Sequence, residues 1–298
     1  MSIAWVFPGQ GSQKLGMADS LLELPGAKER FDLASQILGR DLFKICSGSE
    51  VSKEELFNLN DTRNTQPAMF VVESLLVDDL KRQGREAAMV AGHSLGEIVA
   101  LYAAEVLDAE TALLLLKKRS ELMASAGGGA MIAVLGFDRN QLEDLINETE
   151  GAQIANDNSD SQVVLSGSPA AVQKVANDLK CKRAIPLPVS GAFHSDFMTQ
   201  ASQSFAAELD QITFKSAKIP VLSNVEPNPT LNSDLLKDRL KRQMINGVRW
   251  REIMQAMQNE GITSIIEIGP GNVLSGLAKR AMKGILINQI STASDLGY

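Results

Sequence analysis

The sequence predicts an α/β protein in which a small second domain is inserted into a larger one. Two observations predict this class: short apolar runs alternate with longer helical patterns over most of the chain, and the stretch after Ser125 has a strand-rich order of its own. The 298 residues suffice for two domains. Hydrophobic residues make up 44% and charged residues 22%, which are ordinary globular proportions.

The larger domain is expected to begin with a strand buried on both faces of a parallel sheet. Ile3–Phe7 is nearly all apolar and ends at Pro8 and Gly9, as such a strand does. Similar elements are expected along the chain in this order: helices at about 27–38 and 66–82, a strand at 87–91, helices at about 95–104 and 112–123, and one further strand at 264–268 before a last helix. This alternation favours the α/β class.

The smaller domain is expected over residues 127–194, with residues 1–126 and 195–298 forming the larger, discontinuous one. Gly127–Gly129 is a flexible run suited to a crossing between domains. The polar tract Asn156–Ser161 is expected to connect two neighbouring strands. The predicted elements are a strand at 131–135, a helix at 140–147, strands at 153–155 and 162–166, a helix at 170–179 and a strand at 183–187. This βαββαβ order is the ferredoxin-like pattern.

Charge and cysteine usage exclude several classes of protein. The net charge of −7 has the wrong sign for binding nucleic-acid phosphates. Cys46 and Cys181 lie far apart and form no C-x-x-C pair, so neither a disulfide framework nor a zinc site is indicated. Without a signal-peptide pattern or a membrane span, we expect a cytoplasmic protein. No phosphate-loop pattern is complete, so no nucleotide cofactor and no metal are expected.

The segment Gly92–Gly96 reads G-x-S-x-G, with an apolar run before it and a helical pattern after it. A nucleophilic serine on a sharp strand-to-helix turn has this context, because the strained backbone leaves no room for side chains two residues on either side. The alternative is an ordinary glycine-flanked turn. The flanking elements favour Ser94 as a nucleophile, with Glu97 as a complement to the dipole of the following helix.

A serine nucleophile usually needs an imidazole base, and the chain has only His93 and His194. On an extended segment, the side chain of His93 is expected to face away from Ser94. His194, in the loop that leads to Asp196, is therefore the predicted base. No carboxylate stands out as its partner, so a backbone carbonyl is a candidate to orient the imidazole.

Arg119 is predicted to face the protein core. Its neighbours three and four positions away on the predicted helix are all apolar: Leu115, Leu116, Leu122 and Met123. A buried guanidinium needs an anion, either a carboxylate of the protein or a carboxylate of a substrate. A second basic group, Lys237, Arg239, Lys241 and Arg242, is either a solvated helix face or a surface for an acidic partner.

Six ordered motifs together resemble the malonyl-CoA:acyl carrier protein transacylases of fatty acid synthesis. They are Phe7–Gln13, Gly92–Glu97, Arg119 with Met123, Gly191–His194, Gln243 and Glu267–Gly271. The resemblance covers essentially the whole chain. It implies an α/β-hydrolase-like large domain with an inserted ferredoxin-like domain, and an active site in the cleft between them.

The resemblance also implies a role for each site residue. Ser94 attacks malonyl-CoA, His194 takes and returns the proton, and a malonyl-serine ester links two half-reactions with ping-pong kinetics. By the same resemblance, the other roles are the following: backbone amides of Gln10 and Leu95 form the oxyanion hole, the Gln243 carbonyl orients His194, Arg119 holds the free carboxylate, Met123 lines the substrate site, and Phe193 crowds out a methyl branch. Malonyl-CoA is the substrate and acyl carrier protein the partner. No membrane is involved, and a monomer is favoured.

Two other functions remain open on the residues alone. A thioesterase or other serine hydrolase would use the same serine turn, since transfer differs from hydrolysis only in the exclusion of water. A non-catalytic docking subunit would keep the fold without the chemistry. The presence of Ser94, His194, Arg119 and Gln10 together argues against this second alternative.

Overall fold

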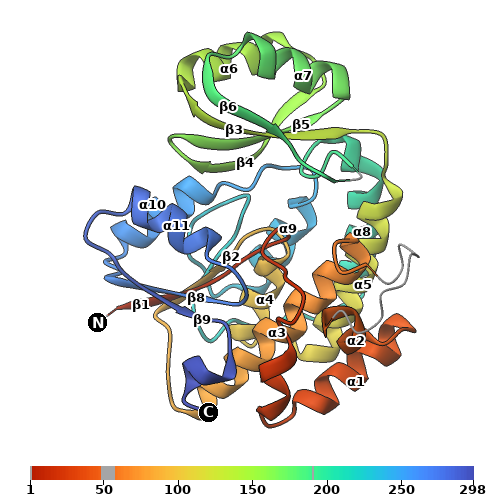
Figure 1. Cartoon of the computed structure of the whole chain (residues 1–298), viewed down its shortest axis with the longest axis vertical. Helices are drawn as coiled ribbons and strands as arrows, with labels where there is room; N and C mark the ends of the chain where they lie inside the picture. Colours follow the sequence, from red (N-terminus) through yellow and green to blue (C-terminus); the bar gives the residue numbers. More distant parts are fainter. Residues whose placement is uncertain (1, 48–57, 190) are drawn as a thin grey trace.

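The computed structural model describes residues 2–47, 58–189 and 191–298, and they form an α/β fold with two separate sheets (Figure 1). The larger sheet has five parallel strands in the order β7-β2-β1-β8-β9. Its strands are β1 (Ile3–Phe7), β2 (Met89–Gly92), β7 (Val221–Leu222), β8 (Ser264–Ile268) and β9 (Leu286–Ile290). Two of them, β7 and β9, were not predicted, so the expectation of a single strand after residue 188 was incomplete.

Helices cover both faces of this sheet, because its central strands are apolar on both sides. In β1, Trp5 and Phe7 face one core, whereas Ala4 and Val6 face another. The first core is covered mainly by α1 (Ala27–Leu38), α2 (Leu42–Ser47), α3 (Thr62–Arg82), α4 (Gly96–Ala103), α5 (Ala109–Ser125), α8 (Thr199–Asp210) and α9 (Ser233–Arg242). The second is covered by α10 (Trp250–Asn259) and α11 (Val273–Ala281).

Helix α3 begins four residues earlier than predicted, because Asp61 caps it. The Asp61 side chain accepts a hydrogen bond from the Arg63 amide. Pro67 lies inside the helix and cannot donate to the Arg63 carbonyl. Arg40 donates to that carbonyl instead, at 2.7 Å, so the helix continues through the proline. This continuation places both Thr62 and Gln66 on the buried side of α3.

The smaller sheet has four antiparallel strands in the order β4-β5-β3-β6. Its elements follow the predicted order: β3 (Ala130–Phe137), α6 (Arg139–Glu148), β4 (Ala152–Ser159), β5 (Gln162–Gly167), α7 (Pro169–Asp178) and β6 (Cys181–Pro186). Both helices lie on the face of this sheet that is turned away from the rest of the molecule (Figure 1). Helix α5 leads up to it from the larger sheet.

The polar tract Asn156–Ser161 is largely strand, which corrects the prediction of a loop. Strand β4 continues to Ser159 through two register shifts. Its polar side chains form specific contacts: Asp157 pairs with Arg139 of α6 beside the same sheet, and with Arg251 of α10 in the rest of the chain. The backbone adds to this contact, since the Val248 amide donates to Ala155 at 2.8 Å. Among the described helices, none is both long enough and apolar enough to cross a membrane.

Candidate active site

Ser94 lies on the sharp turn between β2 and α4. Its φ of 54° is in the left-handed region, which is strained for a residue with a side chain. The turn is possible because a Cβ at Gly92 would lie 1.8 Å from the Gly96 carbonyl oxygen, and a Cβ at Gly96 would lie 2.3 Å from that of Phe7. Glycine is therefore required at both positions, and the serine hydroxyl stands at the end of the strand.

Two carboxamide side chains hold the backbone of this turn. Asn224 accepts from the Ser94 amide at 2.8 Å and donates to the Gly92 carbonyl at 2.6 Å. Gln243 donates from Nε2 to the Ser94 carbonyl at 3.0 Å. Both side chains are buried, so these hydrogen bonds are shielded from water.

His194 faces the serine hydroxyl, with 2.8 Å between its Nε2 and Ser94 Oγ. Its other ring nitrogen, Nδ1, lies 2.9 Å from the Gln243 carbonyl oxygen and 3.2 Å from that of Asn246. Carbonyl oxygens only accept, so Nδ1 carries the proton and Nε2 is free to accept one from the serine. Backbone carbonyls thus orient this imidazole, where many serine enzymes use a carboxylate.

The environment of His194 keeps its imidazole neutral. The side chain is buried, and burial together with the nearby Arg119 cation lowers the pKa of His194 to about 3. At neutral pH the imidazole is therefore in the form that can accept a proton.

Arg119 is buried, as predicted, and no carboxylate of the described residues forms an ion pair with it. Its hydrogen bonds go to neutral groups: to Gln66 Oε1 at 2.7 Å, to Gln243 Oε1 at 2.9 Å and to Ser94 Oγ at 3.1 Å. Burial lowers the pKa of Arg119 to about 10, which still leaves a cation at neutral pH. Of the two anions considered for Arg119, a carboxylate of the protein is therefore not found among the described residues, and the Nε–H group has no partner there either.

Glu97 has a larger role than the helix-dipole complement expected from its position. It is buried, and its Oε2 accepts from Gln243 Nε2 at 2.7 Å and from the Asn224 amide at 3.1 Å. Burial raises the pKa of Glu97, and the hydrogen bonds partly offset that rise. The carboxylate thus anchors the Gln243 carboxamide and the backbone of Asn224, the two residues that hold the serine turn.

Two backbone amides beside the serine are unpaired. Neither the Gln10 N–H nor the Leu95 N–H has a hydrogen-bond partner among the residues that the structure describes. Both residues line the same cavity as Ser94. A pair of free N–H groups near a nucleophile is the arrangement that stabilises an oxyanion.

The cavity at Ser94 is small, at about 90 Å³. It is much smaller than the pockets of roughly 300 Å³ or more that enclose drug-sized ligands. Phe193 and Met123 line it, as do Met131, Asn156, Leu187 and Val189. His93 also borders it, but its Nε2 pairs with Asn158 Oδ1 at 2.9 Å, away from the Ser94 hydroxyl, as predicted.

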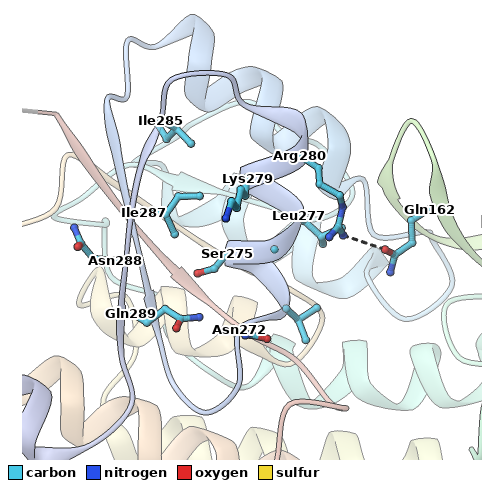
Figure 2. Close-up of a pocket in the computed structure, with 12 residues that line it drawn as sticks. Gln162, Asn272, Ser275, Leu277, Lys279, Arg280, Ile285, Ile287, Asn288 and Gln289 are labelled. Carbon is cyan, nitrogen blue, oxygen red and sulfur yellow. Dashed lines mark hydrogen bonds between the residues drawn. The ribbon is translucent and has the colours of Figure 1, made fainter.

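A larger hollow of about 920 Å³ lies elsewhere, between α11 and β9 (Figure 2). Lys279 and Arg280 border it, and Arg280 donates to Gln162 at 3.3 Å. Figure 2 shows this pair reaching from α11 toward the start of β5. None of the predicted site residues borders this hollow. Volume therefore does not identify the reactive site here.

Each cation of the basic group on α9 has a partner within the chain. Arg239 is buried, and the four cations have these partners: Lys237 the Ile212 carbonyl, Arg239 and Arg242 the Glu226 carboxylate, and Lys241 the Asp210 carboxylate. These pairs do not favour α9 as a surface for an acidic partner.

Several residues of the site were not anticipated from the sequence. Gln66 and Thr62 lie beside Arg119 and Gln10, and Asn224 and Asn246 lie beside Ser94 and His194. The predicted residues Ser94, Leu95, Arg119, Met123, Phe193, His194, Gln10 and Gln243 are all brought together at or next to one cavity. The sequence offers a weak signal only for Gln66, because the residues three and four positions after it on α3, Met69 and Phe70, are apolar.

Known proteins match the chain over its full length. The acyl transferase domain family matches residues 4–297. The malonyl CoA-acyl carrier protein transacylase of Synechocystis sp. is 49% identical over 296 residues, 99% of each chain. A crystal structure of the Synechocystis sp. PCC 6803 malonyl-CoA:ACP transacylase has a TM-score of 0.95 at 48% identity, covering 99% of both chains. A malonyl-transacylase in complex with its type II PKS acyl-carrier protein has a TM-score of 0.93 at 34% identity, covering 99% of this chain and 98% of that one.

Proposed function

The chain belongs to the acyl transferase family, and we propose that it moves a malonyl group from malonyl-CoA to the phosphopantetheine thiol of an acyl carrier protein. The resemblance to malonyl-CoA:acyl carrier protein transacylases is confirmed by relatives and structures that match from end to end. The observation that carries the proposal is the contact of Ser94 Oγ with both His194 at 2.8 Å and Arg119 at 3.1 Å. A base and a carboxylate-binding cation thus meet at one nucleophile.

In the first half-reaction, Ser94 Oγ attacks the thioester carbonyl carbon while its proton passes to His194 Nε2. The negative charge on the carbonyl oxygen is stabilised by the free N–H groups of Gln10 and Leu95. Collapse of this intermediate breaks the carbon–sulfur bond, and the leaving thiolate takes the proton from His194. The products are a malonyl-serine ester and coenzyme A thiol.

Arg119 selects the malonyl group through its free carboxylate. The cation has no carboxylate partner in the described chain, and it borders the cavity at Ser94, where a substrate carboxylate would balance its charge. A bound carboxylate would also offset the charge of Arg119, which holds down the pKa of His194. Malonyl binding therefore makes His194 a stronger base when the serine must lose its proton.

In the second half-reaction, the carrier's phosphopantetheine thiol gives its proton to His194 and attacks the ester. Ser94 regains the proton and the malonyl group leaves on the carrier. The same cavity serves both thiols in turn, so the kinetics are ping-pong. Only protons and an acyl group move, and the chemistry requires no cofactor besides the malonyl-CoA substrate.

The size of the cavity supports a short acyl group. About 90 Å³ accommodates the malonyl end of the substrate but no long acyl chain, which disfavours a thioesterase for long-chain substrates. Phe193 and Met123 border this space, and the bulky Phe193 ring reduces the room for a branched acyl group. We therefore propose malonyl over methylmalonyl selectivity.

We further propose that residues 1–126 and 195–298 form an α/β-hydrolase-like domain and residues 127–194 an inserted ferredoxin-like domain. The serine turn between β2 and α4 supports the first assignment, and the strand order β4-β5-β3-β6 supports the second. We also propose a cytoplasmic location, which the free thiols of Cys46 and Cys181 fit, and a role in fatty acid synthesis, which the similarity to malonyl CoA-acyl carrier protein transacylases supports.

Transfer and hydrolysis are distinguished by following the malonyl group. The protein is incubated with malonyl-CoA, with and without an acyl carrier protein that bears phosphopantetheine. We expect malonyl carrier protein in the first case and little free malonate in the second. Rapid release of malonate without the carrier would identify a hydrolase, and no reaction with either would support a docking subunit.

A further inference from the structure

Thr62 joins two parts of the active site that the mechanism uses separately. Its hydroxyl donates to Gln10 Oε1 at 2.9 Å and accepts from Gln66 Nε2 at 2.9 Å. Gln66 Oε1 in turn accepts from Arg119 Nη1 at 2.7 Å. The carboxylate-binding cation and the residue of the oxyanion loop are thus connected by three hydrogen bonds through Thr62 and Gln66.

The direction of each hydrogen bond in this chain is determined by Arg119. A guanidinium only donates, so Gln66 must turn its oxygen toward Arg119 and its NH2 group toward Thr62. The Thr62 hydroxyl must then accept from Gln66, which leaves its single hydrogen for Gln10. A reversal of either amide would place donor against donor.

The connecting groups are shielded from solvent. Thr62 is 5% exposed and Gln66 is 1% exposed. They lie one helical turn apart near the start of α3, which Asp61 caps. Breaking a buried hydrogen bond leaves a polar group without a partner, so this chain of contacts is costly to rearrange.

We propose that Thr62 is a positioning residue that couples the carboxylate site at Arg119 to the oxyanion donor at Gln10. The assignment rests on the proposed malonyl transfer. Through Gln66, Thr62 holds the guanidinium in the orientation that receives the malonyl carboxylate. Through the Gln10 side chain, it holds the loop whose backbone N–H faces the reacting carbonyl. Loss of the Thr62 hydroxyl therefore weakens both the carboxylate contact at Arg119 and the oxyanion contact at Gln10.

The test measures single-turnover acylation of Ser94 by mass spectrometry after rapid quenching, with malonyl-CoA and with acetyl-CoA. Thr62→Val keeps the shape of the side chain and removes the hydroxyl, whereas Thr62→Ser keeps the hydroxyl. Thr65→Val is the matched control, because Thr65 is also buried on α3. Its hydroxyl donates to the Leu59 and Asp61 carbonyls and takes no part in the hydrogen bonds between Arg119 and Gln10.

We expect Thr62→Val to slow acylation by about 10-fold with acetyl-CoA, which depends on the oxyanion contact at Gln10 alone. With malonyl-CoA we expect about 100-fold, because this substrate also depends on the carboxylate contact at Arg119. The acylation rate of Thr62→Ser should stay within about 3-fold of the wild-type rate. Thr65→Val should lower the stability of the protein without lowering the acylation rate of the folded form. In a Gln10→Ala background, Thr62→Val should slow acetyl transfer by less than about 2-fold, because the contact it supports is already gone.

Equal acylation rates for Thr62→Val and Thr65→Val, or fully additive effects of Thr62→Val and Gln10→Ala with acetyl-CoA, would overturn the coupling while leaving the proposed function intact. Failure of the wild-type protein to form a malonyl-serine would instead overturn the proposed function, and this assignment with it.

Discussion

Arg119 donates a hydrogen bond of 3.1 Å to the hydroxyl of Ser94, so the cation that we propose holds the substrate carboxylate also contacts the proposed nucleophile. The serine oxygen accepts from Arg119 and offers its own proton to His194 Nε2, 2.8 Å away. The arginine therefore favours the serine alkoxide that develops during attack, and it lowers the pKa of His194. One residue thereby affects the substrate, the nucleophile and the base.

Replacing Arg119 by alanine should reduce malonyl transfer far more than acetyl transfer. Each lost charge-assisted hydrogen bond to the carboxylate is worth roughly 1.5 to 3 kcal/mol, which is roughly a 10- to 150-fold loss in kcat/KM. The measurement compares kcat/KM for malonyl-CoA and acetyl-CoA. Lys118→Ala is the control, since Lys118 lies on the same helix and pairs with Glu208 at the surface. Equal losses for both substrates would remove Arg119 from carboxylate binding.

The pH profile of acylation should lack the usual histidine transition. Because burial and Arg119 lower the pKa of His194 to about 3, the base is already neutral throughout the range from about pH 5 to 8. We expect kcat/KM for malonyl-CoA to be flat over this range and to fall only at more acidic pH. An acid limb centred near pH 6.5, the ordinary value for histidine, would contradict the described environment of His194.

Glu73 should make the protein less stable as the pH rises. It is fully buried on α3, neither carboxyl oxygen has a partner in the described chain, and burial followed by the charge of Glu267 raises its pKa well above the usual value. The folded state therefore keeps a proton that the unfolded chain releases above about pH 4.3, so stability falls with pH above that point.

Glu73→Gln removes this titration. Between about pH 4.3 and the raised pKa of Glu73 in the folded state, the free energy of unfolding of the variant should increase relative to that of the wild type by up to about 1.4 kcal/mol per pH unit. Urea unfolding at pH 5 and pH 8 measures the difference. Glu86→Gln, at an exposed position, is the control. The same difference between Glu73→Gln and wild type at both pH values would show that Glu73 does not carry a proton in the folded state.

Gly96→Ala should destabilise the serine turn. A Cβ there would lie 2.3 Å from the Phe7 carbonyl oxygen and 2.9 Å from that of Pro8, so β1 and the turn must separate. We expect a loss of about 3 kcal/mol or more in unfolding free energy, together with loss of Ser94 acylation. Gly276→Ala is the control on α11, where the nearest atom is 3.6 Å away, and it should stabilise by up to about 1 kcal/mol. Equal effects at both glycines would contradict this packing.

The proposed reactive groups could be identified as candidates because each leaves a local signal in the sequence. The serine turn has glycines at fixed spacing between a strand and a helix, and Arg119 stands among apolar neighbours on its helix. His194 follows from the near absence of other histidines. The central strands β1, β2 and β8 were predictable for the same reason, since they are apolar on both faces.

The supporting residues could not be predicted, because their roles depend on contacts between distant segments. Asn224 meets Ser94 across 130 positions, and Thr62 meets Gln10 across 52. The edge strand β9 is mostly exposed and its apolar residues are interrupted by Asn288 and Gln289, and β7 has only two residues, so neither has a strong apolar pattern. Strand β4 resembled a loop because its polar side chains serve contacts with Arg139, Arg251 and His93.

The most direct test of the account is intact-protein mass spectrometry of the wild type and of Ser94→Ala after mixing with malonyl-CoA, followed by addition of acyl carrier protein. We predict a malonyl adduct on the wild type alone, which disappears as the carrier gains the same mass. A malonyl adduct on Ser94→Ala, or transfer to the carrier by Ser94→Ala at the wild-type rate, would contradict the malonyl-serine intermediate.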